Sequence, residues 1–139
     1  MLRIITANLN GIRSAAKKGF FEWANTQSPD ILCIQELKAQ EADLDSALMN
    51  PNGYHGFFQY ALKKGYSGVG LYSKKAPDSV KIGFDDGEFD AEGRYIEARF
   101  GNLIVISAYF PSGSSAPERQ EAKFRFLDLF MPHIKKLKS

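Results

Sequence analysis

The stretch "PDILCIQELKAQ" (Pro29–Gln40) places a glutamine and then a carboxylate at the end of an apolar run. Residues 31–34 are all apolar, which is typical of a strand covered on both faces of its sheet. Gln35 and Glu36 follow where such a strand should still be partly covered. A carboxylate at the mouth of a buried strand indicates either the start of a helix, where negative charge is favourable, or a functional site.

The composition is that of an ordinary globular domain. The 139 residues are 44% hydrophobic and 24% charged, and they contain no long apolar run, so we expect no contact with a membrane. Strand-like sequence begins at Leu2, which predicts no leader segment and a cytoplasmic location. Cys33 lies within the apolar run and is expected to be a small buried hydrophobe. The net charge of +2 is too small to indicate a polyanionic partner by itself.

The order of the predicted elements indicates an α/β (α+β) fold. The first third alternates strand and helix, and the middle of the chain is rich in strands before a final helix that Pro132 should kink or divide. Alternation favours parallel pairing and the strand-rich part favours antiparallel pairing, so we predict a mixed β-sheet with flanking helices. The predicted strands are 3–9, 31–35, 55–62, 68–74, 78–84, 94–100 and 102–110, and the early helices are 12–27 and 39–49.

Polar side chains follow three of these strands. Asn8 and Asn10 end the first, Glu36 ends the second, and Tyr109 ends the last. Because ligand sites in open α/β sheets lie beyond the carboxyl ends of strands, these four residues could meet at one edge. A glutamate with amide oxygens suits Mg²⁺, which takes water and phosphate oxygens as its other ligands. The residues alone leave alternatives open: a helix start for Glu36, plain turns for the asparagines, and packing for the tyrosine.

Five segments point to a known family. "NLNGIRS", "PDILCIQELK", "GYSGVGLYSK", "EGRYIEARF" and "AYFPSGS" occur in this order along the chain. Together they resemble the N-terminal half of the exonuclease III / AP endonuclease family, in the endonuclease/exonuclease/phosphatase superfamily. The resemblance implies half of a four-layer α/β/β/α sandwich of the DNase I-like type, with 1–139 as a single N-terminal portion of the domain and the C-terminal half absent. It implies that each half supplies one sheet, so that this half exposes an inner sheet face and self-associates.

The resemblance also implies roles for individual residues. Tyr109 and Asn8 match catalytic positions, which contact the scissile phosphate and orient the site. Glu36 and Asn10 match the site for Mg²⁺ or Mn²⁺, although some relatives carry an aspartate at the second position and the amide here should bind a cation less strongly. Arg94, in "EGR", matches a recurrent arginine that we expect to be structural. The positions that match DNA contacts are Arg13, Lys18, Lys38, Tyr66 and Ser112.

The activity implied by the resemblance is metal-dependent hydrolysis of duplex DNA on the 5′ side of abasic sites. Exonuclease activity in the 3′→5′ direction and 3′-phosphatase activity on blocked ends are further expectations, in a bacterial, nucleoid-associated enzyme. The family's later Asp-x-Asn and Asp-His motifs do not occur in the 139 residues, so the chain by itself should be weakly active or inactive. The alternatives are another phosphoesterase of the superfamily and a non-catalytic half-domain that binds DNA or protein.

Overall fold

The computed structural model of the chain describes residues 1–112 and 116–138. It divides into two compact units, Met1–Tyr109 and Phe110–Ser139. Compact units of this kind can belong to one domain, so the assignment of 1–139 to a single domain portion stays a prediction.

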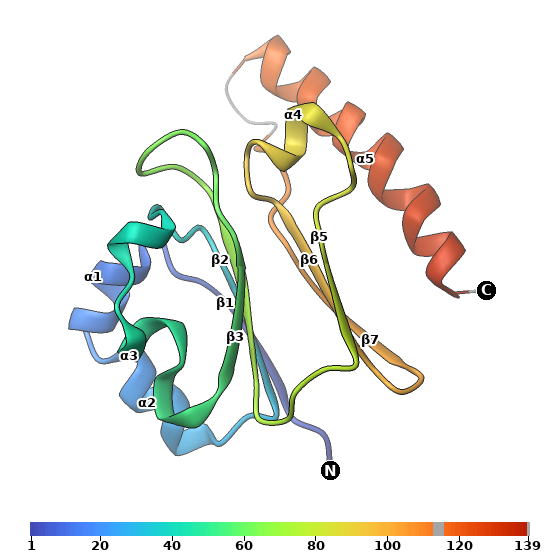
Figure 1. The fold of residues 1–139 in the computed structure, drawn as a ribbon. Coiled ribbons are helices and arrows are strands. Elements are labelled where there is room, and N and C mark those ends of the chain that lie inside the picture. Colours follow the sequence, from blue (N-terminus) through green and yellow to red (C-terminus); the bar gives the residue numbers. More distant parts are fainter. Residues whose placement is uncertain (113–115, 139) are drawn as a thin grey trace. The chain divides into compact units, whose positions relative to one another are not determined.

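The first unit contains two β-sheets (Figure 1). The four-stranded sheet has the order β1-β2-β4-β3. In it, β1 and β2 are parallel and the other pairs are antiparallel, which confirms the predicted mixed sheet. The three-stranded sheet is antiparallel, with the order β5-β6-β7 and the predicted hairpin at β6 and β7. The strands are β1 (Ile4–Asn8), β2 (Ile31–Gln35), β3 (His55–Gln59), β4 (Val69–Ser73), β5 (Ser79–Ile82), β6 (Tyr95–Phe100) and β7 (Leu103–Ala108).

Helices cover one face of the four-stranded sheet (Figure 1). These are α1 (Ile12–Lys17), α2 (Phe20–Gln27) and α3 (Ser46–Met49). The helix predicted over 12–27 is therefore two helices, because Gly19 adopts a left-handed φ of 90° between them, a conformation that glycine takes without a steric penalty. The apolar side chains that join this layer to the sheet include Ile12, Phe21, Leu32, Ile34 and Tyr72.

The helix predicted over 39–49 is wrong in extent. The structure has a 3₁₀ turn at Glu41–Asp43 and the four-residue helix α3, with extended backbone at Leu44 between them. The carboxylates of Asp43 and Asp45 accept hydrogen bonds from nearby backbone N–H groups, and such local bonds compete with a continuous helix. In the same way, the polar turn predicted around residues 85–93 contains a short helix, α4 (Gly87–Asp90), capped by Asp86.

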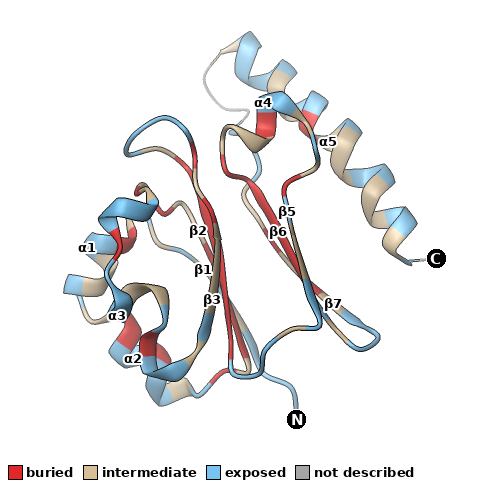
Figure 2. Ribbon diagram, viewed as in Figure 1, coloured by how far each residue is buried: buried red, intermediate tan, exposed pale blue. Residues whose placement is uncertain are grey.

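The three-stranded sheet covers the other face of β2 and β4. Figure 2 shows buried residues along the facing strands, and one apolar cluster joins Ile31, Cys33, Val69 and Leu71 to Ile96, Ala98 and Val105. The expectation that each half of the family domain supplies one sheet, leaving an inner face open here, is therefore wrong for β2 and β4. β1 stays open, since its Ile4 is 44% exposed and its outer edge, like that of β3, pairs with no strand in the described part of the chain.

Cys33 is buried between the two sheets, as predicted. Burial raises the pKa of its thiol from 9.0 to about 11 because the thiolate would lose its hydration. The thiol therefore stays protonated at neutral pH, which argues against a role as a nucleophile.

The second unit contains the predicted final helix, α5 (Pro117–Lys138). The helix runs through Pro132 and is not divided there. Within this unit, the rings of Phe110, Phe126 and Phe130 lie with centroids 4.9–5.8 Å apart. Across residues 1–112 and 116–138, no helix combines the length and apolar character needed to cross a membrane.

Candidate active site

The carboxyl ends of β1 and β2 meet at one edge of the sheet. Their parallel register places Asn8 opposite Gln35, the residue before Glu36. Two backbone hydrogen bonds continue this contact beyond the strands, from Gly11 N to Glu36 O at 2.9 Å and from Ile12 N to Leu37 O at 2.9 Å. The parallel pairing therefore brings the polar ends of the two strands together, as the sequence predicted.

The turn after β2 is backbone-strained. Glu36 and Lys38 have φ values of 59° and 51°, a left-handed conformation that is uncommon for residues with a Cβ atom. The loop before β4 holds this turn, because Leu37 N and Lys38 N donate to Gly68 O and Ser67 O at 3.2 and 2.8 Å. Strain of this kind persists only when neighbouring structure fixes it, and it concentrates at functional sites. The left-handed φ also shows that Glu36 does not begin a helix.

Tyr109 and Lys38 lie beside the Glu36 carboxylate, and Lys38 links it to Asn10 and Asn8. The phenol of Tyr109 lies close enough for the charge of the carboxylate to act on it. Lys38 Nζ lies 3.7 Å from Glu36 Oε1 and donates to Asn10 Oδ1 at 2.5 Å. The side-chain oxygen of Asn8 accepts from Asn10 N at 3.1 Å. The structure thus brings together the four residues predicted for catalysis and metal binding, and the functional roles assigned to them stay predictions.

The Tyr109 phenol is neutral at physiological pH. Burial raises its pKa above the usual value of 10.0, and the negative charge of Glu36 raises it further, while the positive charge of Arg94 acts in the opposite direction. A neutral phenol is a hydrogen-bond donor, which is the state required to bind an anionic oxygen.

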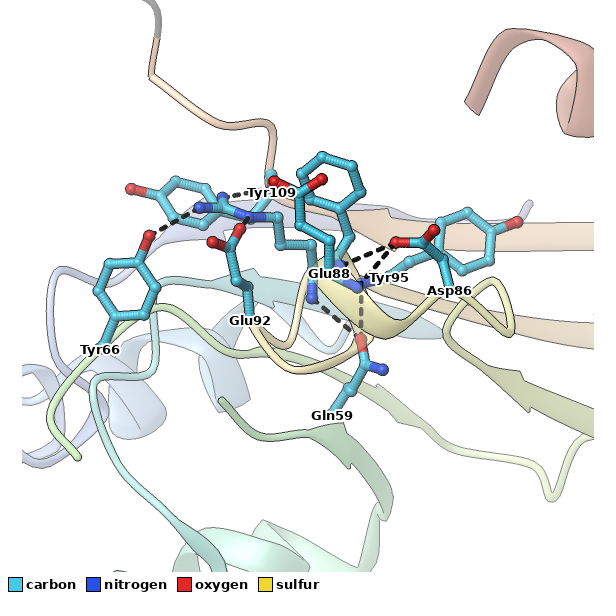
Figure 3. Close-up of polar contacts among 9 residues, drawn as sticks. Gln59, Tyr66, Asp86, Glu88, Glu92, Tyr95 and Tyr109 are labelled. Atoms are coloured by element: carbon cyan, nitrogen blue, oxygen red, sulfur yellow. Dashed lines mark hydrogen bonds and ion pairs between the residues drawn. The ribbon is translucent and has the colours of Figure 1, made fainter. Parts of the chain in front are cut away.

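Arg94 holds the tyrosines of the site in place. Its guanidinium is 3% exposed and donates to Tyr109 O at 3.0 Å, to the Tyr66 hydroxyl at 2.9 Å and to Glu92 at 2.6 Å. It also lies over both phenol rings, 5.3 Å from the centroid of Tyr109 and 5.9 Å from that of Tyr66. Figure 3 labels Tyr66, Glu92 and Tyr109, the three residues that these contacts join. These contacts support the structural role expected for Arg94.

Sequence reasoning missed two partners of Arg94. Gln59 accepts hydrogen bonds from Arg94 N and Tyr95 N at 2.9 and 3.1 Å, and so links β3 to the start of β6 (Figure 3). Glu92 neutralises the buried guanidinium. The "EGR" segment placed a carboxylate two residues before the arginine, which was a local signal for this ion pair, whereas no local signal marked Gln59.

The residues predicted to contact DNA are distributed around the cluster. Arg13 donates to Lys38 O at 3.2 Å and lies 3.7 Å from Asp43, and both members of that pair are well exposed. Lys18 lines an open groove of about 480 Å³ together with Asn8 and Asn10. Lys38 and Tyr66 belong to the contacts described above. Ser112 is exposed and lies in the second unit, so its proximity to the phosphate site stays a prediction.

The donor atoms restrict which metal ion could bind. Within the residues that the structure describes, no group of three or more acidic, histidine or cysteine side chains could hold a metal ion. The Asn10 oxygen is already bonded to Lys38. A site centred on the Glu36 carboxylate therefore fits a hard ion that keeps water ligands and takes phosphate oxygens, as Mg²⁺ does.

Comparisons with known proteins identify the family of the chain. The model of the endonuclease/exonuclease/phosphatase family matches residues 5–136. The chain is 34% identical to an exodeoxyribonuclease of Bacillus subtilis and 31% identical to a DNA-(apurinic or apyrimidinic site) endonuclease of Dictyostelium discoideum, each over 98% of its length. An AP endonuclease structure from Archaeoglobus fulgidus superimposes with a TM-score of 0.84 at 33% identity, over 98% of this chain.

The chain belongs to the endonuclease/exonuclease/phosphatase family, and the relatives that it matches are DNA repair nucleases of the exonuclease III and AP endonuclease type. It spans 53% of the Bacillus relative, 38% of the Dictyostelium relative and 52% of the Archaeoglobus structure. The chain therefore corresponds to about half or less of the length of these relatives.

Proposed function

We propose that the chain is the N-terminal half of a metal-dependent DNA repair phosphodiesterase that cuts on the 5′ side of abasic sites. The observation that carries this proposal is the cluster of Glu36, Tyr109, Asn10 and Lys38 at the ends of two parallel strands and β7. Such a cluster combines a carboxylate for a hard cation with a neutral donor and a positive charge for a phosphate. Exonuclease activity in the 3′→5′ direction and 3′-phosphatase activity belong to the same proposal.

Each residue has a part in binding and orienting the phosphate. Glu36 would hold Mg²⁺ or Mn²⁺, with the Asn10 oxygen as a second ligand once Lys38 releases it, and the bound ion would neutralise charge on the phosphoryl and leaving oxygens. The Tyr109 phenol would donate a hydrogen bond to a phosphate oxygen, and its contacts with Arg94 would hold it in position to do so. Asn8 keeps the Asn10 turn in place through its backbone contact. Arg13, Lys18, Lys38, Tyr66 and Ser112 would grip the DNA backbone without reading sequence.

The remaining half of the domain would supply the catalytic motifs that do not occur in these 139 residues. Relatives about twice as long and the absence of the Asp-x-Asn and Asp-His motifs both support this view. The open edge of β1 supports it too, because an uncharged apolar edge strand invites pairing with another strand. The isolated chain would then be weakly active or inactive, and it would self-associate through β1. The complete protein would be a cytoplasmic enzyme associated with the bacterial nucleoid.

Cleavage of a duplex with one abasic site in the presence of Mg²⁺ tests the proposal. We expect the 139-residue chain alone to give little product, and its mixture with the C-terminal half of the Bacillus relative to give more. The substitution Glu36→Gln in the mixture should remove that gain. Robust cleavage by the isolated chain would contradict the need for a second half, and a gain that survives Glu36→Gln would contradict the role of the carboxylate.

A second candidate is a non-catalytic half-domain that binds DNA. The single-carboxylate donor set favours it, as do the exposed cations Arg13, Lys18 and Lys63. Association with duplex DNA that weakens steeply with salt, is the same with and without an abasic site, and produces no cleavage in any mixture would support this candidate.

A further inference from the structure

The loop of residues 62–67, between β3 and β4, carries three groups suited to a DNA backbone. Lys63 and Lys64 are exposed, and Lys63 Nζ lies 5.2 Å from the centroid of the Tyr66 ring. The loop contains neither helix nor strand. A loop of this kind binds a ligand well only if something else holds its shape, because ordering it on binding would cost affinity.

Gln40 provides one such contact from another part of the chain. Its Nε2 atom donates to Lys63 O at 2.8 Å and to Ala61 O at 3.3 Å, and its Oε1 atom accepts from Gly65 N at 3.4 Å. One amide side chain therefore engages backbone groups on both sides of Lys64. Gln40 is itself held, because its backbone N–H donates to Asp43 Oδ2 at 2.9 Å.

Arg94 holds the other end of the loop. Its guanidinium donates to the Tyr66 hydroxyl, and Glu92 and the Tyr109 carbonyl fix the guanidinium in turn. One connected set of polar contacts thus joins the loop, through Arg94, to Tyr109. Gln40 lies outside that set and reaches the loop from the segment that follows Lys38.

We propose that Gln40 is a positioning residue for recognition of the DNA backbone: together with Arg94 it holds residues 62–67 in the shape that grips phosphates before DNA arrives. This inference rests on the proposed function, since it assumes that the loop contacts DNA. Gln40 touches no phosphate itself. Its contribution is that the lysines and Tyr66 bind without first losing conformational freedom.

The test is Gln40→Met, which keeps the length of the side chain and removes its hydrogen bonds. We expect the dissociation constant for duplex DNA to rise about tenfold, which corresponds to about 1.4 kcal/mol of lost loop ordering. The dependence of affinity on salt should keep its slope, because no charge is lost. Lys63→Gln should instead reduce the slope by about one. Gln27→Met, on α2, is the matched control and should change neither quantity.

Amide hydrogen exchange without DNA provides an independent readout. In Gln40→Met, the amides of Gly65 and Tyr66 should exchange faster, while those of β2 keep their rates. If the unsubstituted chain binds DNA and Gln40→Met binds equally tightly, the inference is wrong, and a reduced salt slope in Gln40→Met would also overturn it. If the unsubstituted chain binds no DNA, the proposed function fails, and unchanged exchange at Gly65 would then reject the holding role as well.

Discussion

The strands β1 and β2 are parallel neighbours with similarly apolar sequences, yet the structure covers them very differently. β2 is paired on both edges and covered on both faces, and its first four residues are buried. β1 is paired on one edge, and three of its five residues are exposed. An apolar sequence therefore indicates that a strand requires cover without indicating what provides it. The candidate site spans this difference, since Glu36 follows the covered strand and Asn10 follows the open one.

The largest contrast between the strands should appear in stability. Ile34 is 0% exposed in the core between the helices and the sheet, so Ile34→Ala should cost about 2–5 kcal/mol of unfolding free energy. Ile4→Ala removes the same atoms from a side chain that is 44% exposed, and it should cost less than about 1 kcal/mol. Urea unfolding of both variants measures the difference. Equal losses would mean that β1 is covered in solution.

Alkaline pH should lower the unfolding free energy of the chain through Cys33, which lies on the covered strand β2. The Cys33 thiol has its pKa raised from 9.0 to about 11 in the folded chain, so the unfolded chain loses this proton first as pH rises. The contribution of this proton to the unfolding free energy is fully present below pH 9. It is lost as pH approaches about 11, and the loss is on the order of 2 kcal/mol. Cys33→Ala should flatten the decline of unfolding free energy between pH 8 and 10.5. An unchanged slope would show that the thiol is accessible to water.

The open edge of β1 should control association of the isolated chain. A lysine on an edge strand discourages pairing with another strand, so Ile4→Lys should lower the apparent mass at high concentration while changing stability little. Ile82→Lys is the matched control, because Ile82 is 49% exposed and lies on β5, the edge strand of the other sheet. Light scattering over a concentration series compares the two. If only Ile82→Lys reduces association, the chain associates through the edge of β5 and not through the edge of β1.

The sequence predicted the elements whose pattern is local. The apolar run 31–34 identified β2 with its observed bounds, and two strands joined at Gly101 identified the β6–β7 hairpin. It failed where side-chain hydrogen bonds compete with helix formation, as at Asp43 and Asp45. It also failed on the cover of β2 and β4, because face-to-face packing of two sheets leaves no local signal.

Within the candidate site, the same distinction holds. The polar residues at strand ends could be predicted, because parallel pairing alone brings Asn8 and Glu36 to one edge. The contacts that fix the site could not, since Gln59 reaches Arg94 across 35 residues and Gln40 reaches Gly65 across 25. Such contacts form only in the finished fold. The residues that make them follow no fixed spacing, so a single sequence does not reveal them.

Binding of Mn²⁺ followed by NMR tests the central claim most directly, because this paramagnetic ion broadens the signals of nearby amides. In the unsubstituted chain, we predict selective broadening at Glu36, Asn10 and Tyr109, and its loss in Glu36→Gln. The carboxylates of Asp85, Asp86 and Glu88 provide an internal comparison. Broadening centred on those residues, or broadening near Tyr109 that persists in Glu36→Gln, would contradict a cation site at the end of β2.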